Sequence, residues 1–431
     1  MNHPHLLFSD KKGKIHRHPF LKMAVSSLNL FKKPKENDLI KIPEGSSLFY
    51  LPNRIPVGFN EKTGEFTPLF EFEGNPVFAV AAFIIPAYLR LYNPAIVKSG
   101  EGRLPLWAYA ACGVVGSNVY VAAARIDRRI RQSPHFYNGS IIRKQVKRFL
   151  KSYPQNRLVR HLSNCALNYN CLAAKNFFLK RWEAPMPTSR VCNARCIGCL
   201  SYQESDCEAS HNRISFKPSV SELYEVMYNH LTSAREAIAS FGQGCEGEPL
   251  FYADTIAEAI SKVRENTACG TINMNTNASM PGKIDLLCRA GIDSFRVSLS
   301  SPQEKFYNRY FRPLNYKFSD VLRSIETAKK HNKFVSVNLF IFPGFSDSKE
   351  EIKALLKFIK NTGVDMLQMR NLNIDPDFYF EVLRSRDFTP QGVTALVNIL
   401  NKEFPRLKIG YFNLPKEKFK NFENMVILNK R

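Results

Sequence analysis

The sequence lacks a stretch typical of a secretory signal, and it has few acidic residues for its number of basic ones. Its first residues, MNHPHLLFSDKKGKIHRHPF, carry charges and prolines where a signal peptide needs an apolar run. We therefore expect a cytoplasmic location, where cysteines act as metal ligands more often than they form disulfides. Lys and Arg number 61 against 38 Asp and Glu, a net charge of +23 that favours an anionic substrate or a polyanionic partner.

Repeats and low-complexity segments are also missing. Over 431 residues the chain is 44% hydrophobic and 23% charged, which excludes a collagen-like protein, a coiled coil and wholesale disorder. Turn residues, charge and apolar runs divide the chain into five parts. These are a basic, poorly ordered arm over residues 1–44, a β-rich domain over 45–125, a basic helical connector over 126–183, a partial barrel over 184–377, and a closing helix and strand over 378–431.

Only one apolar run, Leu104–Ala124, is long enough to span a membrane. Gly113 and the sequence Gly116-Ser117-Asn118 interrupt it. These residues favour a buried β-hairpin with strands Trp107–Val115 and Val119–Ala124, so no membrane span is expected.

The connector is strongly basic. Between residues 125 and 181, fourteen Lys and Arg side chains stand against one acid, Asp127, with aromatic residues interleaved. A solvated helical connector explains this composition, and so does a phosphate-binding surface for nucleic acid or an anionic substrate.

After Ala184 the pattern alternates between strand and helix, which predicts a parallel sheet with right-handed crossovers and a partial (β/α)6 barrel of the α/β class. Ser219 and either Ser346 or Asp347 are expected N-caps, and Gly291 and Gly363 are expected helix ends. The expected strands are 186–191, 236–241, 270–275, 295–300, 335–342 and 365–370. The expected helices are 221–233, 253–266, 281–290, 319–331 and 348–361, followed by a last helix over 390–404 and a strand over 407–411.

The strongest motif follows the first expected strand, at the edge where barrel enzymes place their chemistry. Cys192, Cys196 and Cys199 form a C-x3-C-x2-C triplet. Three thiolates at this spacing can bind three corners of an iron–sulfur cube and leave one iron open. The alternative is a zinc site made by Cys196, Cys199, Cys207 and His211, in a nucleic-acid-binding protein without catalysis.

The triplet and the repeats behind it resemble the radical S-adenosylmethionine (radical SAM) superfamily over roughly Pro185–Asp377, in a subgroup with an N-terminal β-rich extension. The resemblance implies a [4Fe–4S] cluster on the three cysteines and S-adenosylmethionine on the open iron. It also implies reductive cleavage to a 5′-deoxyadenosyl radical that abstracts hydrogen from a substrate. An electron donor such as a ferredoxin or flavodoxin is then expected, and the substrate is unidentified, with an RNA-modifying enzyme as one alternative. The superfamily usually has an aromatic residue before the third cysteine, where this chain has Gly198.

A second motif, Gly242-Gln-Gly-Cys-Glu-Gly-Glu-Pro249, matches GxGxxG, but Glu248-Pro249 stand where a Rossmann helix should already run. It is more similar to the superfamily's GGEP motif, with Glu246 in place of the first glycine. The resemblance assigns the cofactor contacts to residues of this motif and of later strand ends. They are Gly247, Glu248, Pro249, Asn275, Asn277, Ser298, Arg312, Asn338, Gln368 and Arg370.

The remaining cysteines show no metal-ligand spacing. A second cluster that uses Cys165, Cys171 or Cys207 stays open at this point.

Overall fold

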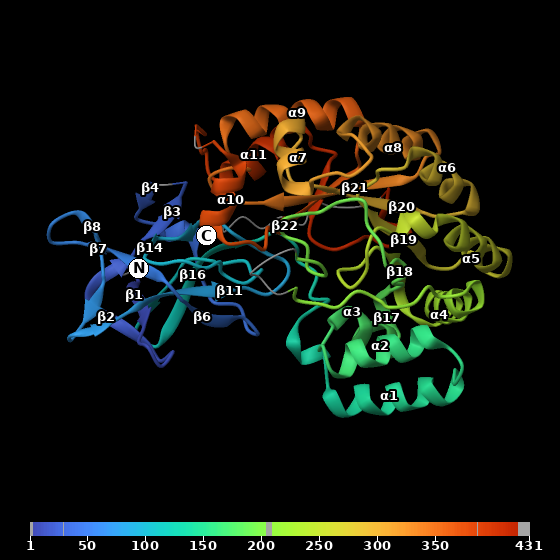
Figure 1. The fold of residues 1–431 in the computed structure, drawn as a ribbon, viewed down its shortest axis with the longest axis horizontal. Coiled ribbons are helices and arrows are strands. Elements are labelled where there is room, and N and C mark those ends of the chain that lie inside the picture. The colour runs from blue at the N-terminus through green and yellow to red at the C-terminus, as the bar shows by residue number, and fades with distance from the viewer. Residues whose placement is uncertain (1–2, 29, 204–208, 386, 421–431) are drawn as a thin grey trace.

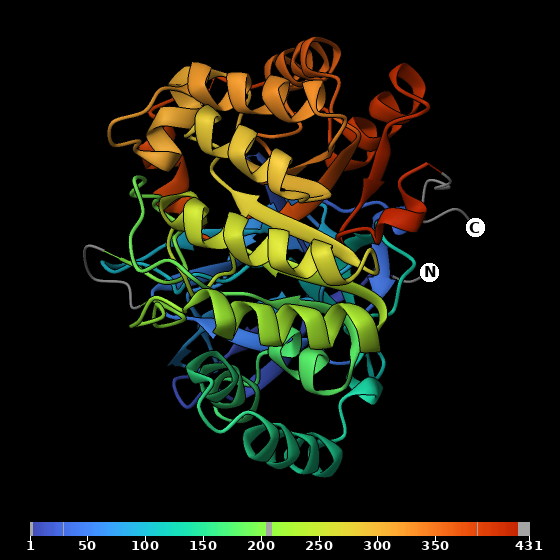
Figure 2. The ribbon, with the colours of Figure 1, turned by 90° about the vertical axis from the view of Figure 1, so that its right-hand side faces the viewer.

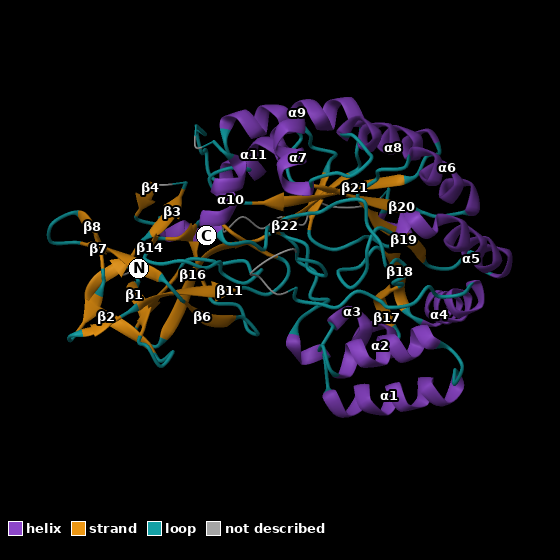
Figure 3. Cartoon of the chain, viewed as in Figure 1, coloured by secondary structure: helices purple, strands orange, loops and turns teal. Residues whose placement is uncertain are grey.

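The computed structural model describes residues 3–28, 30–203, 209–385 and 387–420. Two β-sheet regions lie next to each other in the described chain (Figure 1). The amino-terminal region pairs its strands antiparallel and has few helices, whereas the carboxy-terminal region is a parallel sheet covered by helices (Figure 3). The α/β class and the β-rich amino-terminal region therefore agree with expectation.

The amino-terminal region is built on one 11-stranded antiparallel sheet, in which β1 pairs with β2, β11 and β15. Its strands are β1 (His5–Ser9), β2 (Ile15–Met23), β3 (Val25–Ser27), β4 (Leu30–Lys32), β5 (Leu39–Lys41), β6 (Ser47–Leu51), β7 (Arg54–Asn60), β8 (Glu65–Pro68), β9 (Glu71–Phe72), β10 (Asn75–Pro76), β11 (Phe78–Phe83), β12 (Tyr88–Arg90), β13 (Asn93–Pro94), β14 (Ile96–Lys98), β15 (Cys112–Val115) and β16 (Asn118–Arg125).

The expectation that residues 1–44 form a poorly ordered arm is wrong. This segment supplies β1 to β5, and Phe8, Met23 and Val25 are at most 2% exposed. β1 is buried from Leu6 to Ser9 and β3 over its whole length, whereas most of the basic and histidine residues of β2 stay partly or fully exposed. The expected hairpin of β15 and β16 is confirmed by pairing from Cys112↔Val121 to Val115↔Asn118. No helix of the described chain is long and apolar enough to cross a membrane.

Three helices connect the two regions: α1 (Gly139–Ser152), α2 (Arg157–Leu167) and α3 (Leu172–Phe178). Asn138 and Asn156 cap the first two, because each side chain accepts hydrogen bonds from the first free backbone N–H groups. Apolar side chains of all three helices join the core of the parallel sheet, and the basic side chains of α1 stay outside.

The parallel sheet has seven described strands, and its strand order follows the sequence from β17 to β23. The strands are β17 (Arg181–Pro185), β18 (Arg235–Phe241), β19 (Thr271–Thr276), β20 (Ser294–Leu299), β21 (Phe334–Ile341), β22 (Met366–Asn371) and β23 (Lys408–Gly410). The first strand was expected at residues 186–191. It ends instead at Pro185, so that the segment up to Cys192 is a loop.

Helices cover the outer face of this sheet and lie side by side in Figure 2. They are α4 (Val220–Ser233), α5 (Ala253–Asn266), α6 (Pro281–Ala290), α7 (Glu304–Phe311), α8 (Phe318–Lys330), α9 (Lys349–Thr362), α10 (Pro376–Leu383) and α11 (Val393–Glu403). Ser219 caps α4, and Gly291 and Gly363 end their helices in the left-handed conformation, as expected. The N-cap of α9 is Ser348 and not Ser346 or Asp347, while α7 and α10 were not anticipated.

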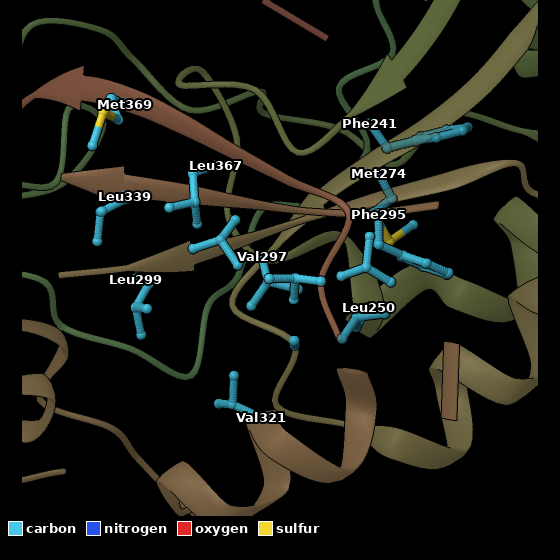
Figure 4. Close-up of a cluster of buried hydrophobic side chains, with 14 of the residues drawn as sticks. Phe241, Leu250, Met274, Phe295, Val297, Leu299, Val321, Leu339, Leu367 and Met369 are labelled. Atoms are coloured by element: carbon cyan, nitrogen blue, oxygen red, sulfur yellow. The ribbon is translucent and has the colours of Figure 1, made fainter. Parts of the chain in front are cut away.

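The main core lies between the strands and these helices. Figure 4 shows Phe241, Met274, Val297, Leu339 and Leu367 gathered there from five neighbouring strands. Because strand side chains alternate, the residues between them point to the concave face, and most of these are polar. The sheet therefore has an apolar convex face and a polar concave face.

The amino-terminal region is attached at the carboxyl end of β22. The Arg54 guanidinium forms a buried ion pair with Asp375 at 2.7 Å, and the Leu104 N–H donates to the same carboxylate at 2.9 Å. The Arg90 N–H donates to Asn371 Oδ1 at 2.9 Å. These contacts place the β-rich region over the edge of the sheet where the strands end.

Candidate functional site

The cysteine triplet lies in the long loop after β17, at the carboxyl end of the sheet. Cys192, Cys196 and Cys199 are partly exposed, and none is in a disulfide. Ala194 forms an isolated bridge with Pro313, and the Cys199 N–H donates to Cys196 O at 3.1 Å, which turns the loop back on itself. The loop therefore presents its three thiols together.

The loop is fixed to α7, the helix that sequence analysis missed. The Ile197 N–H donates to Tyr310 O at 3.1 Å, and the Arg195 N–H donates to Phe311 O at 3.0 Å. These carbonyls at the end of a helix lack partners within the helix, so the loop satisfies them. Gly198 stands where the superfamily usually has an aromatic residue. The Tyr310 side chain of α7 fills the space beside it, since a Cβ at Gly198 would lie 2.8 Å from the Tyr310 hydroxyl.

Neighbouring thiols affect the ionisation of Cys192 and Cys196. Burial raises the pKa of Cys192 to about 12, and it raises that of Cys196, where the neighbouring Cys199 and Cys192 add to the shift. Arg213 Nη2 donates to Cys199 Sγ at 3.7 Å and places one positive charge beside the group. Three thiolates crowded in this way need further cations, which the irons of a cluster supply.

The sequence leaves two kinds of metal site open for these thiols, an iron–sulfur cluster and a single zinc ion. No three His, Cys, Asp or Glu side chains within the described ranges converge on one metal position. The ligands of an iron–sulfur cube bind different irons and need not converge. Cys207, which the zinc alternative requires with His211, lies outside the described residues.

Glu246 braces the site from inside, a role that the sequence did not indicate. Its carboxylate accepts hydrogen bonds from the N–H groups of Gly242 (2.6 Å), Gln243 (2.9 Å), Thr188 (2.7 Å) and Ser189 (3.0 Å), and from the Thr188 hydroxyl (3.0 Å). It is 5% exposed, and burial raises its pKa. One buried carboxylate thus joins the loop after β17 to the loop after β18.

The same two loops also pair through their backbones. The Gly247 N–H donates to Ser189 O at 2.7 Å, and the Glu248 N–H donates to Val191 O at 2.8 Å, directly before Cys192. A Cβ at Gly247 would lie 2.0 Å from Val191 O, so only glycine permits this approach. The GGEP-like motif is therefore held against the cysteine loop.

The Glu248 carboxylate is directed into the protein. It accepts hydrogen bonds from the Thr276 hydroxyl at 2.6 Å, the Asn277 N–H at 2.8 Å and the Leu250 N–H at 3.1 Å. Burial raises its pKa to about 7. These contacts link the loop after β18 to the end of β19, and the buried Pro249 starts the short 3-10 helix that follows.

Asn275, Ser298 and Asn338 lie on three successive strands of the concave face, as the sequence predicted. The Asn275 amide donates to Gly242 O at 3.0 Å, and its own oxygen accepts from Asn273 at 2.9 Å. Ser298 pairs with Asn338 across β20 and β21. Asn338 is 9% exposed, and its Oδ1 has no partner among the described residues. Such an oxygen is free to receive a ligand's donor.

Gln368 and Arg370 are held by the protein itself. The Gln368 amide donates to Asn413 Oδ1 at 2.7 Å and to Ser336 Oγ at 3.2 Å. Arg370 Nη2 donates to Tyr411 O at 3.0 Å, and the guanidinium lies over the Tyr411 ring. Both residues lie on the concave face, as expected for the last long strand.

Asn277 and Arg312 lie beside the cysteine loop. The Asn277 amide donates to Asn193 Oδ1 at 2.8 Å, next to Cys192 in the chain. Arg312 is exposed at the end of α7, where with Arg103, Arg195 and other residues it lines a cavity of about 30 Å³ beside Cys196. The roles of all ten cofactor residues remain predictions, but the structure brings them to one end of the sheet.

Comparison with known families agrees with this geometry. Residues 186–359 match the family model described as the radical SAM superfamily, which lies within the stretch where the resemblance was expected. This superfamily uses a [4Fe–4S] cluster and S-adenosylmethionine. No curated protein sequence matches the chain. The family match favours the enzyme over the zinc-containing protein without catalysis.

Solved structures similar to this chain include native anSMEcpe with bound AdoMet, at 19% identity and a TM-score of 0.35, with 44% of this chain and 52% of that one covered. The chain thus spans about half the length of that protein. Methylornithine synthase (PylB) has 14% identity, a TM-score of 0.38 and coverage of 62% and 78%. SuiB of Streptococcus suis bound to S-adenosylmethionine has 16% identity, a TM-score of 0.38 and coverage of 62% and 61%.

Proposed function

This chain carries a radical SAM superfamily domain at residues 186–359, and we propose that it cleaves S-adenosylmethionine reductively and abstracts hydrogen from a substrate. Cys192, Cys196 and Cys199 hold the [4Fe–4S] cluster in this proposal. When bound, the cluster supplies one electron to the sulfonium, which gives methionine and a 5′-deoxyadenosyl radical. The reductant is a small electron-transfer protein of the ferredoxin or flavodoxin type.

One observation carries this proposal: the cysteine loop and the GGEP-like loop are joined by two backbone hydrogen bonds, at Gly247 and Glu248. The pairing holds the ligands of the cluster and a cofactor-binding loop in one fixed arrangement. Fixed positions lower the entropic cost of bringing the sulfonium to the open iron.

Asn338 and Ser298 support the cofactor-binding assignment most directly. The free Oδ1 of Asn338 is buried at the concave face, and a buried oxygen without a partner costs about 1–3 kcal/mol until a ligand satisfies it. Glu248 acts as a positioning residue, because its carboxylate is already used by Thr276 and Asn277.

The amino-terminal β-rich region has a protective role in this proposal. It lies over the carboxyl end of β22, where Arg54 and Arg90 attach it. A radical made at this end of the sheet reacts with its substrate only if water and other side chains are kept away. The region also supplies Arg103 to the cavity beside Cys196.

The charges on the concave face favour an anionic substrate. Arg296 is 9% exposed, and its Nε has no hydrogen-bond partner within the described chain. Burial lowers the pKa of Arg296 to about 9, and the nearby Arg370 adds to the shift. A carboxylate or phosphate on the substrate compensates two such charges better than a neutral group does.

A larger anion, RNA, is the second candidate substrate. The exposed side of α1 carries Arg143, Lys144, Lys147, Arg148 and Lys151, and no acidic residue lies on this helix. If these residues contact phosphates, RNA affinity will fall steeply with salt, and charge reversal at Lys144 and Lys147 will flatten the dependence. If RNA binding in a filter assay is absent or does not depend on salt, RNA is excluded and the small anion remains the proposed substrate.

Replacement of one ligand tests the proposed activity. After anaerobic reconstitution, Cys196→Ser should form no 5′-deoxyadenosine above background in the presence of dithionite and S-adenosylmethionine. Its far-UV circular dichroism should match the parent, because Cys196 lies in a loop. The exposed Cys269 provides the control, and Cys269→Ser should retain the full rate. Normal 5′-deoxyadenosine formation by Cys196→Ser would refute the assignment.

A further inference from the structure

A second group of cysteines surrounds a cavity outside the site described above. The cavity has a volume of about 290 Å³ and is lined by Cys165, Cys171 and Cys245 together with His161 and His211. None of these five side chains is among the three cluster ligands and ten cofactor residues named above.

Three separate elements bring the thiols together. Cys165 lies on α2, one turn after His161, and its Sγ is 3.5 Å from His161 Nε2. Cys171 precedes α3, and its N–H donates to Cys165 O at 2.9 Å. Cys245 lies in the loop after β18, where its carbonyl accepts from the Ile214 N–H at 2.8 Å. The arrangement is thus fixed by backbone contacts.

The thiols interact with one another across the cavity. Cys165 and Cys245 are in direct side-chain contact, and Cys171 acts electrostatically on both. None of the three forms a disulfide in this structure. A buried structural cysteine normally packs alone among apolar side chains, whereas here thiols and imidazoles share one cavity.

Nowhere in the described parts of the chain do three potential ligands converge on one ion. The side chains that line this cavity are nevertheless of the types that bind iron–sulfur clusters. Thiolates are the usual ligands of such clusters, and histidine replaces cysteine in some of them.

We propose that this cavity holds a second iron–sulfur cluster, ligated by Cys165, Cys171 and Cys245. His161 and His211 face the same space, and one of these imidazoles is the fourth ligand. The cavity lies against the first site, because Arg213 lines it and also donates to Cys199 Sγ at 3.7 Å. Cys245 is two residues from Gly247, so one loop contacts both sites.

Iron content measured on two complementary variants tests this inference. One variant replaces Cys192, Cys196 and Cys199 with alanine, and the other replaces only Cys165 with serine, the smallest change that removes a ligand. Iron and acid-labile sulfide are counted after anaerobic reconstitution, and the reduced clusters are examined by electron paramagnetic resonance. Cys288→Ala, at a buried cysteine outside both sites, is the control and should bind as much iron as the parent.

We expect the triple variant to keep about half of the parent's iron, with a reduced spectrum that S-adenosylmethionine does not change. Cys165→Ser should lose the complementary signal and keep the one that S-adenosylmethionine perturbs. If the triple variant folds and binds no iron, the second cluster is refuted and the proposed activity stands. A Cys165–Cys245 disulfide in anaerobically purified parent, seen as a mass loss of two hydrogens, also refutes it. If the triple variant keeps all the iron, the proposed function itself fails.

Discussion

Replacing Gly247 with alanine should separate the two loops that form the site. The new Cβ would lie 2.0 Å from Val191 O and 2.5 Å from the Val191 carbonyl carbon, both backbone atoms that cannot rotate away. To reach ordinary contact the loops must move apart by more than 1 Å, which breaks the hydrogen bonds of Gly247 to Ser189 (2.7 Å) and of Glu248 to Val191 (2.8 Å). Overpacking and the lost bonds together cost about 2–4 kcal/mol.

That cost predicts the size of the effect on activity. Each 1.4 kcal/mol changes an equilibrium about tenfold, so the paired arrangement should become roughly 30- to 1000-fold less populated. The rate of 5′-deoxyadenosine formation by the reconstituted Gly247→Ala protein should fall by a similar factor. The assay is anaerobic, with dithionite and saturating S-adenosylmethionine, and rates are expressed per iron bound.

A glycine of the same loop provides the matched control. A Cβ at Gly244 would have its nearest contact, Leu200 Cδ1, at 3.5 Å, so Gly244→Ala should retain the parent rate. Equal rates for Gly247→Ala and the parent, with equal iron content, would refute the argument that this backbone pairing assembles the site.

Two further predictions concern stability. Arg54→Ala should lower the free energy of unfolding by about 3–5 kcal/mol in urea, because it removes the ion-pair partner of the buried Asp375 at 2.7 Å and of Asp377 at 2.9 Å. Burial raises the pKa of Glu351 from 4.5 to about 7, so the folded state binds its proton more tightly than the unfolded state. Stability should therefore fall by up to about 3 kcal/mol between pH 4.5 and pH 7, and Glu351→Gln should remove this part of the pH dependence. An unchanged pH profile in Glu351→Gln would contradict the shift.

Local patterns were sufficient for the elements with strong periodicity. The helices α4, α5, α6, α8 and α9 begin and end within one or two residues of expectation. Ser219 marks the start of α4, and Gly291 and Gly363 mark the ends of α6 and α9. The arm over residues 1–44 was misjudged, because its basic residues suggest an exposed segment, whereas pairing with β11 and β15 buries β1. The helix α7 was missed because it has only eight residues, although Phe306, Tyr307, Tyr310 and Phe311 lie on one buried face.

The sequence by itself determined the cysteine triplet, the family and the alternation of strands and helices, because each depends on spacing within a few residues. Only the tertiary structure decided that Glu246 braces two loops through contacts reaching 58 residues along the chain. It alone brought Cys245 beside Cys165 and Cys171. Such contacts depend on how distant segments pack around a common core, and the local sequence does not indicate which segments will meet.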